Sequence, residues 1–147
     1  MGNRLAESDL LQPLLSGIAA RGWVGSRSIL VDELHWSGRR VDLVALTSTR
    51  TTIAFELKLN ATRRAIQQSS YNRLAFDRSY VVTAVQPTEV SIKAAENAGV
   101  GVIVVTSEGM YVVLQARASE VDTRLKQKVV RVIREAHDVR DEVLALP

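Results

Sequence analysis

The sequence predicts an α/β domain with a mixed sheet flanked by helices, and three observations support this fold class. Segments rich in β-branched and aliphatic residues alternate along the chain with segments of helical periodicity. Short polar connections join the first three strand-like segments, which is typical of an antiparallel meander. Helical segments separate the later strands, as in mixed sheets that carry helices on their faces.

The N-terminal half is predicted to begin with a helix over 5–21, because its leucines and isoleucine recur at helical spacing. Pro13 lies inside this pattern and indicates either a kink or a later helix start. Three strands follow, over 28–36, 40–46 and 51–59.

The remaining elements are predicted from cap residues and apolar spacing. In order, they are a helix over 61–76 capped by Asn60, a strand over 79–85, a helix from Pro87 to about Ala98, a hairpin of 100–106 and 110–115, and a long terminal helix over 121–144. The apolar stripe of the last helix is suited to packing on the sheet or on a second subunit.

Composition narrows the function classes. The chain has 147 residues, 46% hydrophobic and 24% charged, which fits one domain over 1–147. Cysteine is absent, so disulfides and thiolate chemistry are excluded. No secretory pattern or apolar run of membrane-spanning length is found, and we expect a cytoplasmic protein without membrane contact. A net charge of +3 favours a polyanionic partner.

Three charged residues interrupt strands that otherwise look buried. Asp42 lies in the second strand, between Val41 and Leu43. Glu56 and Lys58 lie in the third strand, on the face opposite Phe55 and Leu57. A buried charge costs several kcal/mol unless it is paired or bound to a metal, so we expect these residues to have a function.

Two carboxylates converging from neighbouring strands are suitable ligands for Mg²⁺, which binds one or two carboxylates together with water and phosphate. A bound cation acidifies water and stabilises charge on a phosphate. Lys58 is suited to positioning that water or stabilising the phosphorus centre. The alternatives are a solvated ion pair of Glu56 with Lys58, and pairing of Asp42 with Arg39 or Arg40.

These residues resemble the signature of the PD-(D/E)XK nuclease superfamily, which has the restriction-endonuclease-like fold. Asp42 matches the acid of the second core strand, and Glu56 and Lys58 match the (D/E)-x-K of the third. Val41 stands where the superfamily name has proline. Residues 5–85 reproduce the αβββαβ core order, with 87–147 as additional strands and helices. In size and layout the chain looks similar to archaeal Holliday-junction resolvases.

The resemblance also implies accessory residues. Glu7 is the candidate for the acid on the first helix, with Asp9 as a weaker one. Gln67 and Tyr71 match the Gln-x-x-x-Tyr motif of RecB-like nucleases, with Gln68 as the alternative if the helix is rotated. The resemblance implies that Asp42, Glu56 and the carbonyl of Leu57 bind Mg²⁺, with Mn²⁺ as a substitute.

We therefore expect a Mg²⁺-dependent DNA endonuclease, with structure-selective cleavage as a specific version. Contacts to the DNA backbone are expected from Arg39, Arg40, Arg63, Arg64 and Tyr71. A homodimer would cut two strands by symmetry. The alternatives are a catalytically inactive nuclease-fold protein that binds nucleic acid or a partner protein, and an unrelated α/β domain. No phosphate-loop motif is present, so no nucleotide cofactor is expected.

Overall fold

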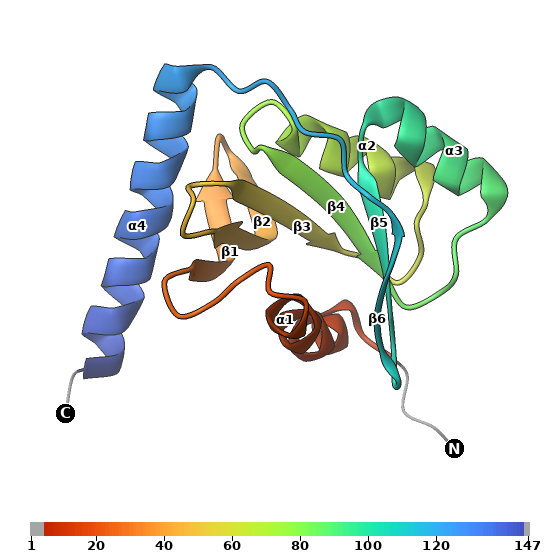
Figure 1. Cartoon of the computed structure of the whole chain (residues 1–147), viewed down its shortest axis with the longest axis horizontal. Helices are drawn as coiled ribbons and strands as arrows, with labels where there is room; N and C mark the ends of the chain where they lie inside the picture. The colour runs from red at the N-terminus through yellow and green to blue at the C-terminus, as the bar shows by residue number, and fades with distance from the viewer. Residues whose placement is uncertain (1–4, 146–147) are drawn as a thin grey trace.

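The computed structural model describes the backbone of residues 5–145 and the side chains of residues 5–141. Six strands form one mixed sheet in the order β1-β2-β3-β4-β5-β6, and helices cover both of its faces (Figure 1). The elements are η1 (Glu7–Leu10), α1 (Leu11–Ala20), β1 (Ile29–Trp36), β2 (Arg39–Leu46), β3 (Thr52–Leu57), α2 (Arg63–Asn72), β4 (Arg78–Thr83), α3 (Glu89–Ala98), β5 (Gly101–Thr106), β6 (Gly109–Leu114) and α4 (Thr123–Ala145).

The strand directions follow the connections. Strands β1, β2 and β3 are antiparallel, as expected for short turns. Strands β3, β4 and β5 are parallel because α2 and α3 provide the crossovers, and β6 returns antiparallel to β5. The predicted fold class is confirmed: the sheet is mixed, it is flanked by helices, and its layout is consistent with the restriction-endonuclease-like fold.

Each face of the sheet has its own apolar core. On one face, Leu14 and Ile18 of α1 pack against Phe55 and Tyr80, whose rings stack with centroids 5.7 Å apart. On the other face, α4 packs against β1 and β2, while α2 and α3 cover β4 and β5 (Figure 1). Among the described residues, no helix has the length and apolar character needed to cross a membrane.

Several element boundaries differ from those predicted. The first helix begins as the 3₁₀ turn η1, and Pro13 then falls in the first turn of α1, where its missing N–H is tolerated. Helix α2 is capped by Thr62 instead of Asn60, because the Thr62 hydroxyl accepts the N–H of Ala65 at 3.1 Å. Strand β3 ends at Leu57, before Lys58.

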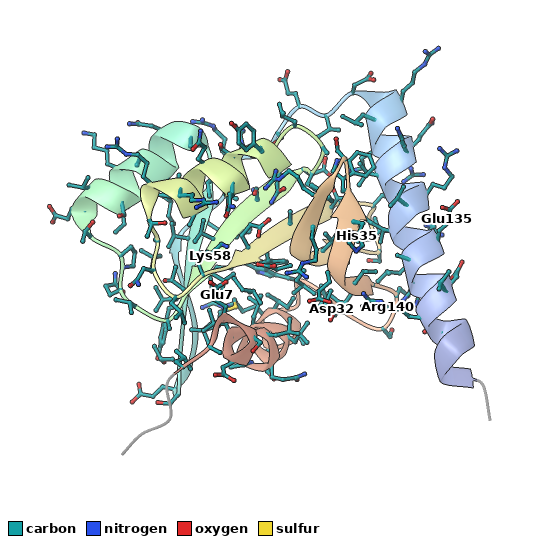
Figure 2. The ribbon with its side chains drawn as sticks, turned by 180° about the vertical axis from the view of Figure 1, so that it is seen from behind. Glu7, Asp32, His35, Lys58, Glu135 and Arg140 are labelled. Carbon is teal, nitrogen blue, oxygen red and sulfur yellow. The ribbon has the colours of Figure 1, made fainter. Side chains whose placement is uncertain are left out.

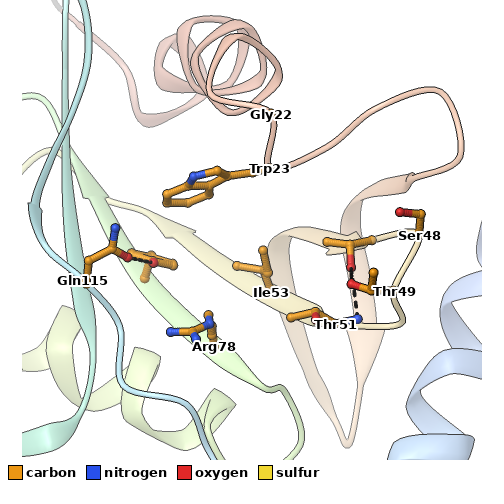
Figure 3. A pocket seen from close by; sticks show the side chains of 10 residues that line it. Gly22, Trp23, Ser48, Thr49, Thr51, Ile53, Arg78 and Gln115 are labelled. Atoms are coloured by element: carbon orange, nitrogen blue, oxygen red, sulfur yellow. Dashed lines mark hydrogen bonds between the residues drawn. The ribbon is translucent and has the colours of Figure 1, made fainter.

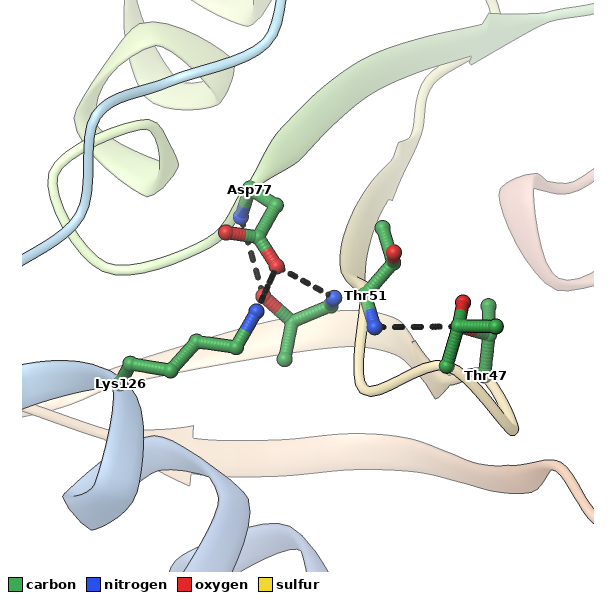
Figure 4. Close-up of polar contacts among 6 residues, drawn as sticks. Thr47, Thr51, Asp77 and Lys126 are labelled. Carbon is green, nitrogen blue, oxygen red and sulfur yellow. Dashed lines mark hydrogen bonds and ion pairs between the residues drawn. The ribbon is translucent and has the colours of Figure 1, made fainter. Parts of the chain in front are cut away.

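A polar cluster around Asp77 joins the starts of β3, β4 and α4 (Figure 4). The Asp77 carboxylate accepts the backbone N–H of Thr52 at 2.8 Å, and the hydroxyl of the fully buried Thr52 accepts the N–H of Asp77 at 2.9 Å. Lys126 of α4 forms an ion pair with the same carboxylate. Farther along α4, Arg140 forms an ion pair with Asp32 of β1 (Figure 2). Two ion pairs thus hold α4 against the sheet.

We predict that Thr52→Val destabilises the protein by about 1–3 kcal/mol, because the N–H of Asp77 loses its acceptor in a buried position. Unfolding in urea, followed by circular dichroism, measures the change. The matched control is Thr49→Val, since Thr49 is exposed and its substitution should stay within about 0.5 kcal/mol. Equal stability of the two variants would contradict this role for Thr52.

Candidate functional site

The candidate site lies where β2 and β3 separate. Backbone pairing of these strands runs from Leu46 and Thr52 to Leu43 and Phe55 and goes no further. Beyond that pair, the Asp42 side chain takes the place of a backbone acceptor: its Oδ2 accepts the N–H of Leu57 at 2.8 Å. On the other side of β3, pairing with β4 continues, because the N–H of Lys58 donates to the carbonyl of Val82 at 2.9 Å. The end of β3 is therefore open only toward β2.

Glu56 is buried at this opening, with 4% of its surface exposed. Its Oε1 accepts a hydrogen bond from Nδ2 of Asn72, at the end of α2, at 3.0 Å. Arg39 donates in turn to Oδ1 of Asn72 at 3.5 Å and to the carbonyl of Gln68 at 3.2 Å. A chain of donors thus runs from the guanidinium through the amide to the carboxylate, and it fixes which way the Asn72 amide faces.

Burial raises the pKa of Glu56 to about 7. The hydrogen bond from Asn72 lowers this pKa, whereas the charge of Asp42 and a hydrogen bond shared with its carboxyl group raise it. Arg39 contributes a smaller lowering through its charge. The Asp42 and Glu56 carboxyl groups are therefore electrostatic neighbours where β2 and β3 separate.

Two neighbouring carboxylates are suitable ligands for one divalent cation. The oxygens Oδ2 of Asp42 and Oε1 of Glu56 are held by donors from Leu57 and Asn72, so each carboxylate keeps a second oxygen for a ligand. Within the described residues, no group of three or more His, Asp or Glu side chains is arranged to hold a metal. Two carboxylates with water and phosphate suit Mg²⁺, so this donor set fits the predicted cation.

Lys58 and Glu7 meet beside the two carboxylates. The ammonium of Lys58 lies 3.9 Å from the carboxylate of Glu7, and Figure 2 shows the two labelled side chains next to each other. Glu7 also lines a hollow of about 260 Å³ together with Asp42, Leu57 and Arg40. The structure thus brings Glu7 to the site and pairs Lys58 with Glu7, instead of with Glu56 as in the predicted alternative.

The Gln-x-x-x-Tyr residues lie together on one face of α2. Gln67 and Tyr71 are exposed, and the Gln67 amide donates to the Tyr71 hydroxyl at 3.5 Å. The buried positions of α2 include Ser69 and Asn72, and Asn72 is the residue that contacts Glu56. Asn72 is not among the residues predicted from the sequence, although its spacing from the small and apolar Ala65, Ile66 and Ser69 places it on the buried face of α2.

The arginines predicted to contact DNA, and the acidic candidate Asp9, do not form one cluster. Arg63 and Arg64 are exposed in the first turn of α2, and Arg40 is exposed and lies 3.6 Å from Glu33. Arg39 is half-buried, with its guanidinium 5.5 Å from the centroid of the Tyr71 ring, and it also contacts Asn72. The weaker acidic candidate, Asp9, accepts the N–H of Ala6 at 2.8 Å and caps η1.

We predict that the charge of Glu56 destabilises the cation-free protein. Because the folded-state pKa is raised from 4.5 to about 7, folding holds a proton that the unfolded chain releases, and stability falls as pH rises through this window. Glu56→Gln should therefore be more stable than the wild type near pH 8, by at most about 3 kcal/mol, and equal to it near pH 4. Urea unfolding in EDTA measures the stability difference between the two proteins at both pH values. A difference that does not vary with pH would contradict the raised pKa.

We predict that Asn72→Leu raises the pKa of Glu56 further, because the carboxylate loses its buried donor. Carbon-detected NMR titration of the glutamate carboxyl groups measures this pKa. The matched control is Gln67→Leu, on the exposed side of the same helix, which should leave the titration unchanged. Equal titrations in the two variants would show that Asn72 does not act on Glu56.

Comparisons with known proteins address the fold. No protein-family model matches the chain, and no curated protein matches it. A solved structure of a protein of unknown function from Silicibacter pomeroyi is similar, with 15% identity and a TM-score of 0.66 over 97% of this chain and 93% of that one. A repair endonuclease from Pyrococcus abyssi has 16% identity and a TM-score of 0.49 over 69% of this chain and 48% of its own. The first likeness shows a shared fold, and neither likeness shows an activity.

Proposed function

We propose that this protein is a metal-dependent nuclease that hydrolyses phosphodiester bonds in DNA as an endonuclease. The observation that carries the proposal is the placement of two acidic side chains where β2 and β3 separate: Asp42 accepts the N–H of Leu57, the residue after Glu56, and Glu56 is buried against Asn72. Burying two carboxyl groups next to each other without a cation is costly, and a divalent cation bound between them would offset that cost.

In this proposal, Asp42, Glu56 and the backbone carbonyl of Leu57 hold Mg²⁺, or Mn²⁺ in its place. Once bound, the cation would acidify a water molecule and stabilise charge on the phosphate. The N–H of Leu57 and the amide of Asn72 keep the two carboxylates in their orientation. Arg39 is a positioning residue, since it acts through Asn72.

Lys58 supplies positive charge next to the scissile phosphate. Its pairing with Glu7 at 3.9 Å is longer than a hydrogen bond, and both side chains are partly exposed, so a phosphate can replace Glu7 as the partner of the ammonium. Glu7 then serves as an accessory acid at the rim of the hollow. Lys58 would act as an electrostatic stabiliser or as a general base.

The DNA backbone would approach from the exposed side of this hollow. Arg40 lines the hollow itself, and Arg63 and Arg64 follow β3 at the start of α2. Their contacts would be to phosphates, which sets affinity without sequence preference. A homodimer with two such sites, as the sequence analysis predicts, stays a prediction that sedimentation velocity can test.

We predict that the purified protein cleaves plasmid, single-stranded or branched DNA in Mg²⁺ or Mn²⁺, and that EDTA abolishes cleavage. Asp42→Asn and Glu56→Gln would each remove a ligand of the cation, and Lys58→Met would remove the positive charge next to the phosphate. Each should therefore lower the rate by at least about 100-fold. The matched controls are Lys93→Met and Glu96→Gln, which are exposed on α3. Both controls should cleave at the wild-type rate.

A second measurement tests binding of the cation separately from DNA cleavage. Mg²⁺ should stabilise the wild type against urea above neutral pH, and it should not stabilise Asp42→Asn. Cleavage that survives Asp42→Asn and Lys58→Met would defeat the proposed mechanism. DNA binding that is indifferent to Mg²⁺, without cleavage by any preparation, would instead identify the catalytically inactive alternative.

A further inference from the structure

A second pocket lies at the other end of α1, away from the candidate metal site. It has a volume of about 370 Å³, within the range of small-molecule sites, and lies between the segment after α1 and the starts of β3 and β4 (Figure 3). The hollow beside Asp42 includes Glu7 and Leu11, whereas this pocket includes Gly22 and Trp23. The ten residues of α1 separate the two by about 15 Å.

An aromatic side chain forms one wall of the pocket. Trp23 is half-buried, and Figure 3 shows its ring projecting from the segment after α1 over the strands. The ring is tilted by 36° against Tyr80, with centroids 5.4 Å apart, and Tyr80 is itself buried and stacked on Phe55. The tryptophan is thus supported from one side by a rigid aromatic core, and Ile53 lines the pocket below it.

The other walls are polar and carry positive charge. Arg78 donates to the carbonyl of Ala116 at 2.7 Å and forms no ion pair with any residue that the structure describes. Gln115 accepts the Tyr80 hydroxyl through Oε1 at 2.8 Å, which leaves its amide N–H groups for a ligand. The loop over 47–51 adds hydroxyl groups, and no acidic residue lines the pocket.

We propose that this pocket binds a single nucleotide, with the base against Trp23 and the phosphate at Arg78 and the hydroxyls of the 47–51 loop. The half-buried Trp23, which lines the pocket and packs against Tyr80, favours a planar ligand, because a base can stack on an aromatic ring that is held in place. Arg78 favours an anionic group, since its guanidinium has no carboxylate partner among the described residues. The Gln115 amide can donate to the edge of the base. A purely apolar ligand would leave the guanidinium and hydroxyl groups desolvated.

The nucleotide could be free or part of a nucleic-acid strand, and one experiment separates these sources. Trp36→Phe makes Trp23 the sole tryptophan, since the chain has two. Its fluorescence is then titrated in EDTA with each of the four nucleoside monophosphates, with a short single-stranded oligonucleotide and with inorganic phosphate. We expect saturable quenching by a nucleotide, with inorganic phosphate binding at least about tenfold more weakly.

In the same background, Arg78→Gln should weaken nucleotide binding by about tenfold or more. Trp23→Leu, measured by calorimetry, should do the same and leaves the Arg78–Ala116 contact intact, so it serves if Arg78→Gln does not fold. The matched control is Arg131→Gln, exposed on α4, which should bind as the wild type does. Binding of the oligonucleotide without free nucleotides assigns the pocket to a strand, and binding of free nucleotides assigns it to the free ligand.

The proposal is overturned if neither nucleotides nor the oligonucleotide quench Trp23 saturably, if Arg78→Gln and Trp23→Leu bind as the wild type does, or if inorganic phosphate binds as tightly as the nucleotides. The inference does not depend on the proposed nuclease function. The titration contains no divalent cation and uses residues outside the candidate metal site, so failure of the pocket leaves cleavage unaffected and failure of the nuclease leaves quenching unaffected.

Discussion

The burial of the Glu56 carboxyl group beside that of Asp42 is the constraint on which the site depends. A lone carboxylate in this position would lose hydration without compensation. The surrounding structure supplies that compensation through the N–H of Leu57, the amide of Asn72 and, behind the amide, Arg39. The cost is also visible in the sheet, because the Asp42 side chain occupies a place where a backbone hydrogen bond between β2 and β3 would otherwise form.

Much of the fold could be predicted from the sequence because its signals are local. Alternation of apolar residues identifies β1, β2 and β3, and the short turns between them leave antiparallel pairing as the consistent arrangement. The residues at which the helices begin were harder to predict from the sequence. Asn60 and Thr62 are both good cap residues, and the sequence alone does not say which hydroxyl or amide reaches the backbone of the first turn.

The residues of the candidate site likewise divide into those that local sequence patterns reveal and those that depend on tertiary packing. Asp42, Glu56 and Lys58 could be found because charged residues are unusual inside apolar strands. The three residues also match the acid and the (D/E)-x-K of a short known motif. Asn72 could not be found from that motif, since its role depends on how α2 is rotated about its axis and on Arg39, which comes from another strand. The ion pair of Lys58 with Glu7 likewise joins residues far apart in the sequence, and it required the packing of η1 beside the end of β3.

The Asp77 cluster gives β3 two unlike ends. At its start, one carboxylate ties the strand to β4 and to α4, through bonds that do not involve the candidate site. At its finish, backbone pairing with β2 has already ended, and one side-chain contact, from the N–H of Leu57 to Asp42, bridges the two strands. We therefore expect these two strands to part first at Leu57 and last at Thr52, so that fraying of the sheet begins at the candidate site.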